Sequence, residues 1–244
     1  MSTFLILVPA RYGSSRFPGK PLAKIHGRSM ISYLVDNCKN TGFDYAIVTD
    51  DDRIEEEVKS LGASVVRVDD DIQTGSERIA LAYERYFEEK NYEYIINVQG
   101  DEPLLKADTL KSLADFHTKN PFYDITTLVK PRLSSEDEFQ NSNVVKCIKT
   151  ENGKCLYFTR CSAPFNRDKG EHRWFQHIGV YCYKVDSLKK FVTLPMSTLE
   201  KTECLEQLRA LENNMSIGAL ESNVNLIGVD TPEDLKKVEG ALGV

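Results

Sequence analysis

Residues 8–22 combine the side chains that bind a polyanion. The segment reads Val-Pro-Ala-Arg-Tyr-Gly-Ser-Ser-Arg-Phe-Pro-Gly-Lys-Pro-Leu, and it follows an apolar run, residues 4–8, that predicts a buried strand. Three cations, Arg11, Arg16 and Lys20, stand among its glycines and serines. Because open α/β sheets bind ligands at the carboxyl ends of strands, these cations and the backbone N–H groups can converge on phosphates. We expect a nucleoside triphosphate as the ligand.

The spacing within this loop excludes two common nucleotide motifs. It lacks the Walker pattern, in which two glycines precede Lys and Ser or Thr, and it lacks the G-x-G-x-x-G of dinucleotide sites. The alternative is a solvated surface turn. However, Pro18 and Pro21 stiffen the backbone on either side of Gly19 and Lys20. This stiffening favours a loop that fixes the direction of the lysine.

Asp101 and Asp230 have the side chains and the positions to bind a divalent cation. Asp101 follows the apolar segment 94–98, and Asp230 follows the apolar segment 226–229. Carboxylates at strand ends beside bound phosphates suit Mg²⁺, which takes one or two carboxylates and completes its octahedron with water and substrate oxygens. For Asp230 the alternative is the N-cap of the helix that follows.

A third segment offers groups that read a nucleobase. Residues 74–76 (Thr-Gly-Ser) and Gln99 present hydroxyl, backbone and amide groups to a pyrimidine edge, and Arg78 is expected to reach phosphate or ribose. The alternative is a capped helix start, marked by Ser76, in which Glu77 and Arg78 are solvated.

The pattern of apolar residues predicts an α/β fold. In the first half, strands alternate with amphipathic helices, which implies a mostly parallel, Rossmann-like sheet flanked by helices. The strands are expected at 4–8, 45–49, 64–68 and 93–98, and the helices at 30–38, 54–61 and 76–87. In the second half, strands are expected at 125–130, 144–150, 155–160 and 179–185, with a hairpin turn at 152–153, and helices at 187–192, 203–212 and 231–242.

These elements predict one domain over residues 1–244. Its nucleotide-binding core is expected to comprise approximately residues 1–120 and 203–244. Approximately residues 121–202 are expected to form a β-rich subsidiary lobe.

Several segments together resemble one family of enzymes. Besides the loop, they are TGSER (74–78), NVQGDEP (97–103), LYFTR (156–160), HIGVY (177–181), LEQLR (205–209) and GVDTPEDL (228–235). In this order, and over nearly the whole chain, they resemble the sugar-activating cytidylyltransferases, which share a nucleotide-diphospho-sugar transferase fold. The resemblance is greatest to the 3-deoxy-manno-octulosonate cytidylyltransferase (CMP-Kdo synthetase) family.

The resemblance implies an activity, a metal and a set of site residues. The activity is transfer of CMP from CTP to the anomeric hydroxyl of 3-deoxy-D-manno-octulosonate (Kdo), with release of pyrophosphate, for lipopolysaccharide biosynthesis. Mg²⁺ is the implied cofactor, held by Asp101 and Asp230, while Lys20 and Arg11 neutralise charge during the transfer. The implied CTP-binding residues are Pro9, Ala10, Arg11, Ser14, Arg16, Lys20, Thr74, Gly75, Ser76, Arg78 and Gln99. The implied sugar-binding residues, in the β-rich lobe and beyond it, are Gln99, Arg160, His177, Tyr181, Glu206 and Gln207.

The sugar and the protein class have alternatives. Residues 161–168 and 223–227 depart from the family pattern near the sugar side, so the 8-amino analogue of Kdo is an alternative substrate. Glu206 is the one acid that we place near its amine. Enzymes that activate sialic acid or a polyol phosphate are further alternatives, although the sialic-acid signature has Gly-Gly-Ser-Lys after the arginine. The last alternative is a non-catalytic nucleotide sensor, but a sensor does not need both Asp101 and Asp230, and this chain has both.

Composition and charge set the remaining expectations. The chain has 244 residues, of which 41% are hydrophobic, so it can bury a full core. A net charge of −6, with no Lys/Arg run longer than two, excludes a broad nucleic-acid surface. The six cysteines lack C-x-x-C spacing, and no stretch of ~20 apolar residues occurs. The first apolar run is shorter and less charged than we expect of a signal peptide. We therefore expect a cytoplasmic protein with reduced thiols, mostly buried, and no membrane insertion.

We also expect a homodimer built by the β-rich lobe. The resemblance implies it, and the predicted strands carry aromatic and aliphatic residues that a small lobe cannot cover alone. These residues are Tyr157, Phe158, Val180, Tyr181 and Tyr183.

Overall fold

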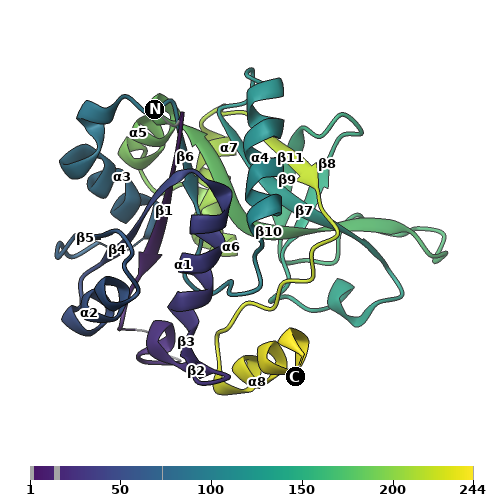
Figure 1. The fold of residues 1–244 in the computed structure, drawn as a ribbon. Helices are drawn as coiled ribbons and strands as arrows, with labels where there is room; N and C mark the ends of the chain where they lie inside the picture. The colour runs from purple at the N-terminus through teal and green to yellow at the C-terminus, as the bar shows by residue number, and fades with distance from the viewer. Residues whose placement is uncertain (1–2, 14–16, 73, 244) are drawn as a thin grey trace. The chain divides into compact units, whose positions relative to one another are not determined.

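The computed structural model describes residues 3–13, 17–72 and 74–243 (Figure 1). The chain divides into two compact units. Unit 1 comprises Met1–Ser112 and Val224–Val244, and unit 2 comprises Leu113–Asn223. The division falls within helix α4 (Ala107–Lys119), which the sequence analysis did not predict.

Unit 1 is built on a parallel sheet with the neighbour order β6-β1-β4-β5. Its strands are β1 (Phe4–Ala10), β4 (Asp44–Thr49), β5 (Val65–Arg67) and β6 (Tyr94–Asn97). The chain begins in the middle at β1, adds β4 and β5 on one side, and then adds β6 on the other. Such a reversal opens a crevice at the carboxyl ends of the two strands that flank it, here β1 and β6.

Helices connect these strands, as the alternating pattern predicted. They are η1 (Lys20–Leu22), α1 (Met30–Thr41), α2 (Asp52–Ser60), α3 (Gly75–Tyr86), η2 (Glu88–Lys90) and α8 (Pro232–Leu242), with the small hairpin β2 (Lys24–Ile25) and β3 (Arg28–Ser29). Met30 joins Ile25, Val229 and Val238 in a buried cluster. This cluster secures the C-terminal helix α8 to the segment that follows the first strand.

Two helix starts differ from the expected ones. The N-cap of α3 is Thr74, whose side chain accepts a hydrogen bond from Glu77 N at 3.2 Å, so Ser76 is not the cap. The N-cap of α8 is Thr231, in a capping box with Asp234. The capping role considered for Asp230 therefore belongs to its neighbour.

Unit 2 is β-rich. Its strands are β7 (Ile125–Leu133), β8 (Lys146–Lys149), β9 (Cys155–Thr159), β10 (Arg173–Lys184) and β11 (Ile217–Glu221). β10 pairs antiparallel with β7 and β8, β8 pairs antiparallel with β9 through the predicted turn at 152–153, and β11 pairs parallel with β7. The helices are η3 (Asp137–Phe139), α5 (Val185–Thr193), α6 (Thr198–Glu203) and α7 (Gln207–Glu212).

Three features of unit 2 differ from the expectations. The helix predicted over 203–212 is two helices, because Cys204 adopts φ 51°, the left-handed conformation that ends α6. β10 begins at Arg173, earlier than the expected strand, and β11 was not predicted. Residues 203–223 cluster with unit 2, not with the first unit, because α7 packs on β9 and β11 pairs with β7.

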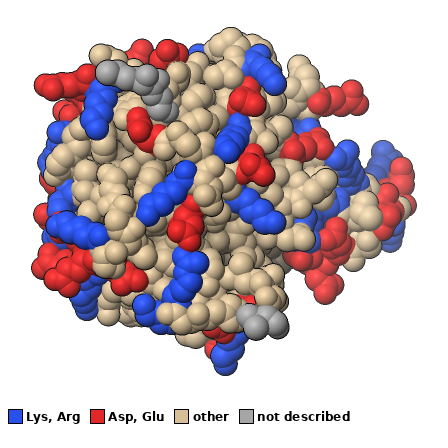
Figure 2. Space-filling model, in the orientation of Figure 1, with Lys and Arg blue, Asp and Glu red and all other residues tan. Residues whose placement is uncertain are grey.

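The predicted fold class is confirmed as an α/β architecture whose mostly parallel sheet is flanked by helices. Four of the six cysteines are buried and all six are free thiols. None of the helices in the described part of the chain is long and apolar enough to cross a bilayer. Basic and acidic side chains are interspersed over the face drawn in Figure 2.

A buried histidine in unit 2 makes the stability of the fold depend on pH. His117 is fully buried on α4, and its Nδ1 lies 2.8 Å from Thr126 Oγ1. Burial lowers the pKa of His117 from 6.5 to about 4. The unfolded chain therefore binds a proton as the pH falls through 6.5, whereas the folded chain resists protonation until about pH 4.

We predict that acid destabilises the protein partly through His117. Between pH 7 and pH 4 the free energy of unfolding should fall by up to about 3 kcal/mol more in the native protein than in His117→Gln. Urea denaturation at several pH values measures this difference. Burial also lowers the pKa of His177, to about 3, but that residue is common to both proteins. Parallel stability profiles for the two proteins would contradict the role of His117.

Candidate functional site

A cavity of about 240 Å³ lies in unit 1 at the carboxyl ends of β1 and β6. The predicted CTP-binding residues that line it are Pro9, Ala10, Arg11, Lys20, Thr74, Gly75, Arg78 and Gln99. Asp101 also contributes to the lining. Residues 9–21, 74–78 and 99–101, far apart in the sequence, thus meet where the strand order reverses. Ligands of open α/β sheets bind at such a reversal.

Of the predicted CTP-binding residues that the structure describes, Ser76 is not among those that line the cavity. Ser14 and Arg16 lie outside the described residues. Ser76 is buried, with 2% of its surface exposed, because its position in the first turn of α3 directs it into the core. The hydroxyl available from this turn is that of Thr74.

Gly100 allows the turn after β6 to approach β1. A Cβ atom at this position would lie 2.7 Å from the carbonyl oxygen of Pro9, which is closer than real Cβ atoms come to backbone. Only glycine permits this approach. The approach carries Asp101 to the cavity beside the loop that follows β1.

Lys20 lies between the two aspartates that were predicted to bind metal. Its Nζ donates to Asp101 Oδ2 at 3.1 Å and to Asp230 Oδ1 at 3.5 Å. The backbone N–H of Val229 donates to the carbonyl of Asp101 at 3.0 Å, which draws the segment that ends in Asp230 alongside the turn after β6. Residues separated by 81 and 210 positions therefore form one charged cluster.

These two carboxylates fit a divalent cation. Both already contact a single positive atom, Lys20 Nζ, so one cation can be shared between them. In the part of the chain that the structure describes, no set of three or more His, Cys, Asp or Glu side chains forms a complete metal site. Two carboxylates with the remaining positions open match Mg²⁺, which keeps water or takes substrate phosphates.

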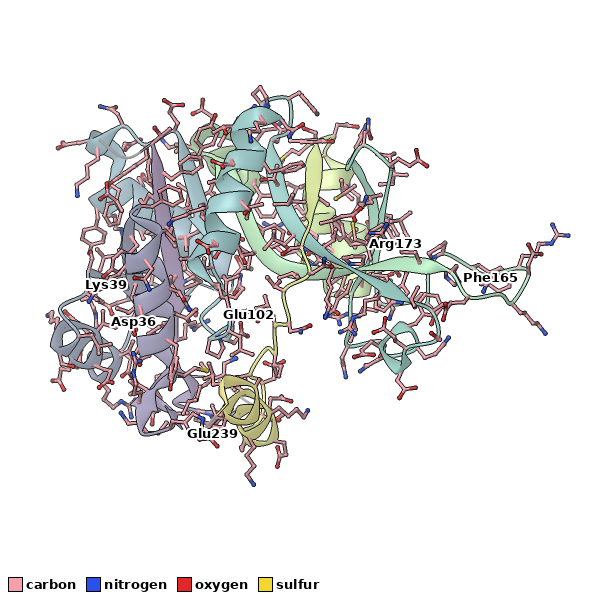
Figure 3. All side chains as sticks on the ribbon, turned by 45° about the vertical axis from the view of Figure 1, so that its right-hand side comes forward. Asp36, Lys39, Glu102, Phe165, Arg173 and Glu239 are labelled. Carbon is pink, nitrogen blue, oxygen red and sulfur yellow. The ribbon has the colours of Figure 1, made fainter. Side chains whose placement is uncertain are left out.

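Glu102 is an acidic neighbour of this cluster that sequence reasoning did not assign. Its side chain, labelled in Figure 3, packs against Gly228: a Cβ atom on Gly228 would lie only 3.4 Å from Glu102 Oε1. Burial, and then the negative charge of Asp101, raise the pKa of Glu102 to about 8. The one signal in the sequence was its place directly after Asp101.

Asp50, at the end of β4, organises two of the arginines and was also missed. Its Oδ2 lies 3.4 Å from Arg11 Nε and 3.1 Å from Arg78 Nη2. Arg78 is only 1% exposed and also donates to the carbonyl of Val68, so the reading of Arg78 as a solvated residue is wrong. Burial lowers the pKa of Arg78, and the Asp50 carboxylate opposes this shift.

The aromatic ring of Tyr12 packs between Arg53 and Gly19, the residue before Lys20. The guanidinium of Arg53 lies 3.2 Å from the ring centroid of Tyr12, and Asp51 holds that guanidinium through Nε and Nη2. The same ring would lie 3.0 Å from a Cβ atom at Gly19, whose φ is 71°. Glycine is therefore needed at this position for its conformation and for the space. The stack places Lys20, the next residue, at the start of η1.

Unit 2 holds Arg160 through backbone carbonyls. Its Nε donates to Glu203 O at 2.7 Å, Nη1 to Ser142 O at 3.2 Å and Nη2 to Cys204 O at 3.3 Å. A guanidinium has five N–H donors, so one N–H remains on each of Nη1 and Nη2. That remaining pair is the donor set that a carboxylate accepts in a bidentate manner.

The other predicted sugar residues of unit 2 include a neutral histidine. His177 Nε2 lies 3.1 Å from Thr127 Oγ1, and this hydroxyl also lies 2.8 Å from the carbonyl of Val180. Because the hydroxyl has one proton to donate, we assign the ring proton to Nε2, which leaves Nδ1 as an acceptor. Burial lowers the pKa of His177 to about 3, so the ring is neutral near pH 7.

Tyr181, Glu206 and Gln207 complete this group within unit 2. The rings of His177 and Tyr181 are 5.4 Å apart between centroids. Glu206 is near enough to Tyr181 for its charge to add to the effect of burial in raising the pKa of that phenol. Gln207 is the first residue of α7 and is 7% exposed. The turn between α6 and α7 thus brings Glu206 near Tyr181 of β10, and the carbonyls of Glu203 and Cys204, where α6 ends, hold Arg160.

Comparison with known proteins finds one family. A family described as Cytidylyltransferase matches residues 5–217. A protein of Thermodesulfovibrio yellowstonii named 3-deoxy-manno-octulosonate cytidylyltransferase is 40% identical over 250 residues, which cover 98% of this chain and 97% of that protein. A protein of Fusobacterium nucleatum with the same name is 40% identical over 236 residues, which cover 96% of this chain and 95% of that protein.

Solved structures agree with this finding. The structure of CMP:2-keto-3-deoxy-manno-octonic acid synthetase complexed with CTP matches with a TM-score of 0.92 and 31% identity, and the match covers 99% of this chain and 98% of that one. A cytidylyltransferase from Leptospira borgpetersenii matches with a TM-score of 0.65 at 18% identity, over 99% of this chain and 87% of that one, which shows a shared fold alone.

We predict that Asp50 stabilises unit 1 by neutralising buried Arg78. Asp50→Asn should lower the free energy of unfolding by about 2–3 kcal/mol, because a buried guanidinium loses its counter-charge. Asp52→Asn is the matched control: Asp52 pairs with Arg67 but its side chain is 87% exposed, so its loss should cost less than about 0.5 kcal/mol. Denaturation curves compare the two variants. Equal, small losses would show that Arg78 does not depend on Asp50.

Proposed function

We infer the function from the cytidylyltransferase family, to which this chain belongs, and propose that it transfers CMP from CTP to the anomeric hydroxyl of Kdo. The products are CMP-Kdo and pyrophosphate. The observation that carries the proposal is the cavity at the ends of β1 and β6, where Arg11, Lys20, the turn at 74–75 and Asp101 meet. Lys20 also contacts Asp230. The near full-length relatives are named for this reaction.

The chain's own groups supply what nucleotidyl transfer needs. The attacking hydroxyl, the α-phosphorus and the leaving pyrophosphate must be aligned, and the growing negative charge must be neutralised. Lys20 and Arg11 both line the cavity and provide positive charge. Arg78, held by Asp50, adds a buried positive charge at the wall of the same cavity. The transfer therefore does not require a nucleophilic side chain.

We propose Mg²⁺ as the cofactor, with Asp101 and Asp230 as its protein ligands. When bound, Mg²⁺ neutralises phosphate charge and makes the sugar hydroxyl more acidic, which lessens the need for a strong general base. Lys20 would then be free to turn its ammonium from the carboxylates toward the phosphates. The observation that supports this assignment is the position of Lys20 Nζ between both acids.

For the nucleobase we propose contacts from Thr74, Gly75 and Gln99. Gly75 lies close enough to Gln99 that a Cβ atom on it would be 3.7 Å from Gln99 Oε1, so the two segments face one space. A hydroxyl, a backbone amide and a side-chain amide are sufficient to read the edge of a cytosine. We also propose Gln99 as a sugar-binding residue.

For the sugar we propose that Arg160 binds the carboxylate and that a group of unit 2 residues binds the hydroxyls. Arg160 retains one N–H on each terminal nitrogen, and neutral His177 offers Nδ1 as an acceptor. Tyr181, Glu206 and Gln207 add hydroxyl, carboxylate and amide groups. Glutamate accepts from a hydroxyl almost as readily as from an amine, and the relatives are named for Kdo, so Kdo takes precedence over its 8-amino analogue.

We further propose a homodimer that acts in the cytoplasm, in lipopolysaccharide biosynthesis. The strand residues first considered for the dimer surface do not support it, because Phe158, Val180 and Tyr183 are buried within unit 2. Exposed apolar residues of unit 2 support it better: Phe165, labelled in Figure 3 on the long β9–β10 loop, is 88% exposed, and Leu156 is 53% exposed. Sedimentation should give twice the 27.7 kDa chain mass, and a single-chain mass at micromolar concentration would refute the dimer.

Release of pyrophosphate tests the proposed reaction. We expect release from CTP with Kdo and Mg²⁺, none in EDTA, and a preference for Kdo over its 8-amino analogue of at least about 10-fold, or 1.4 kcal/mol. Lys20→Ala should remove most of the activity. Lys24→Ala is the matched control, because this lysine of β2 has a 59% exposed side chain and should not affect turnover. No release with any acidic sugar would refute the function, and near-normal turnover in Lys20→Ala would refute the role of the loop.

A further inference from the structure

Lys146, the first residue of β8, is a lysine without exposed surface. Buried lysines usually pair with an acid, because an isolated charge is costly in an apolar interior. Among the described residues, none of the carboxylates lies within ion-pair distance of Lys146 or of Arg160. The two cations are near enough that the charge of Arg160, after the larger effect of burial, lowers the pKa of Lys146.

Backbone carbonyls take the place of an acid around Lys146. Its Nζ donates to Asn141 O at 2.7 Å and to the carbonyl of Arg160 at 3.2 Å, and the ring of Trp174 lies 6.0 Å away. The Arg160 guanidinium donates to Ser142 O, the carbonyl next to that of Asn141. Lys146 and Arg160 therefore hold the same turn, residues 141–142, from two sides. Through these contacts Lys146 fixes the backbone carbonyl of Arg160. It also holds the turn whose Ser142 carbonyl accepts from the Arg160 guanidinium.

Lys146 also lies between Arg160 and His177 in the sheet of unit 2. It pairs with Thr159, directly before Arg160, and with Gln176, directly before His177. The backbone N–H of His177 donates to Val145 O at 2.9 Å. A change at the start of β8 is thus transmitted to both residues that are proposed to bind the sugar.

We propose that Lys146 is a positioning residue for the acidic sugar: it fixes Arg160 through the 141–142 turn and adds a second positive charge near the Arg160 guanidinium, to which a carboxylate substrate would bind. The Glu203 carboxylate accepts from the backbone N–H of Arg160 at 2.9 Å, not from its guanidinium. The inference rests on the proposed function. Lys146 does not touch the substrate, since its side chain has no exposed surface. Its effect is to hold Arg160 and to supply charge in a region of low dielectric, where charges interact strongly.

A second lysine on the same strand provides a matched control. Lys149 has a 4% exposed side chain, but it pairs with Glu221 at 2.9 Å and lies over the ring of Phe175 at 4.2 Å. Its charge is therefore neutralised within the protein. Lys149→Met removes a buried lysine from β8 without removing positive charge from the region of Arg160.

The test compares Lys146→Met, Lys146→Gln and Lys149→Met in the pyrophosphate assay with CTP, Kdo and Mg²⁺. We expect Lys146→Met to raise the KM of Kdo by about 10-fold or more while the KM of CTP changes by less than about twofold. Lys146→Gln retains a donor for one carbonyl and should recover part of the loss. Lys149→Met should leave both KM values unchanged. Equal changes in the two KM values, or an unchanged KM of Kdo in Lys146→Met, would overturn the proposal.

A surface variant keeps the proposal testable if the Lys146 variants do not fold. Asn141 is exposed, and its Oδ1 accepts from Asn143 N at 2.9 Å, which closes the turn that Lys146 and Arg160 hold. Asn141→Ala should raise the KM of Kdo selectively, by about two- to threefold, and an unchanged value would count against the bracing. The activity of the native chain distinguishes a failure of the proposed function from a failure of the role of Lys146. If the native chain converts no acidic sugar, the proposed function fails, whereas normal native activity with an unaltered Kdo KM in the variants overturns only the role of Lys146.

Discussion

The ammonium group of Lys20 lies between the carboxylates of Asp101 and Asp230, and the candidate site depends on this contact. Two acids close together repel each other and become harder to ionise unless a cation lies between them. In unit 1 that cation is the same lysine that is expected to bind phosphate. Gly19 and Tyr12 fix the lysine, Gly100 brings Asp101 against β1, and a backbone hydrogen bond from Val229 brings Asp230 alongside. The fold therefore holds two acids beside one positive atom, which is the arrangement that a divalent cation requires.

The two units hold buried cations by different means. Arg78 is neutralised by Asp50, the same carboxylate that holds Arg11. Arg160 and Lys146 are instead held by backbone carbonyls, which satisfy N–H donors without cancelling the charge. A cation bound by carbonyls retains its attraction for an anion. This difference suits a protein whose triphosphate is expected to meet an additional metal, while its acidic sugar has only side chains for its carboxylate.

Sequence reasoning located the groups near β1 and β6 because parallel strands bring their carboxyl ends to one edge. It did not identify Asp50, whose role depends on β4 being the neighbour of β1, a pairing that no local pattern specifies. Nor did it identify Lys146, since lysines are mostly exposed and its burial arises only when β8 pairs with β9 and β10. The break between α6 and α7 was missed because a left-handed Cys204 has no signal like that of glycine. The CTP and sugar contacts themselves stay predictions.

Titration of Mg²⁺ and CTP into Lys20→Met, compared with the native chain by calorimetry, tests the central claim most directly. If Lys20 is the counter-ion of Asp101 and Asp230 and also a ligand of the triphosphate, its removal should change the two affinities in opposite directions. We predict that Mg²⁺ alone binds the variant at least about 10-fold more tightly, because a competing cation is gone, and that CTP without Mg²⁺ binds more weakly. An unchanged or weaker affinity for Mg²⁺ in the variant would contradict the account.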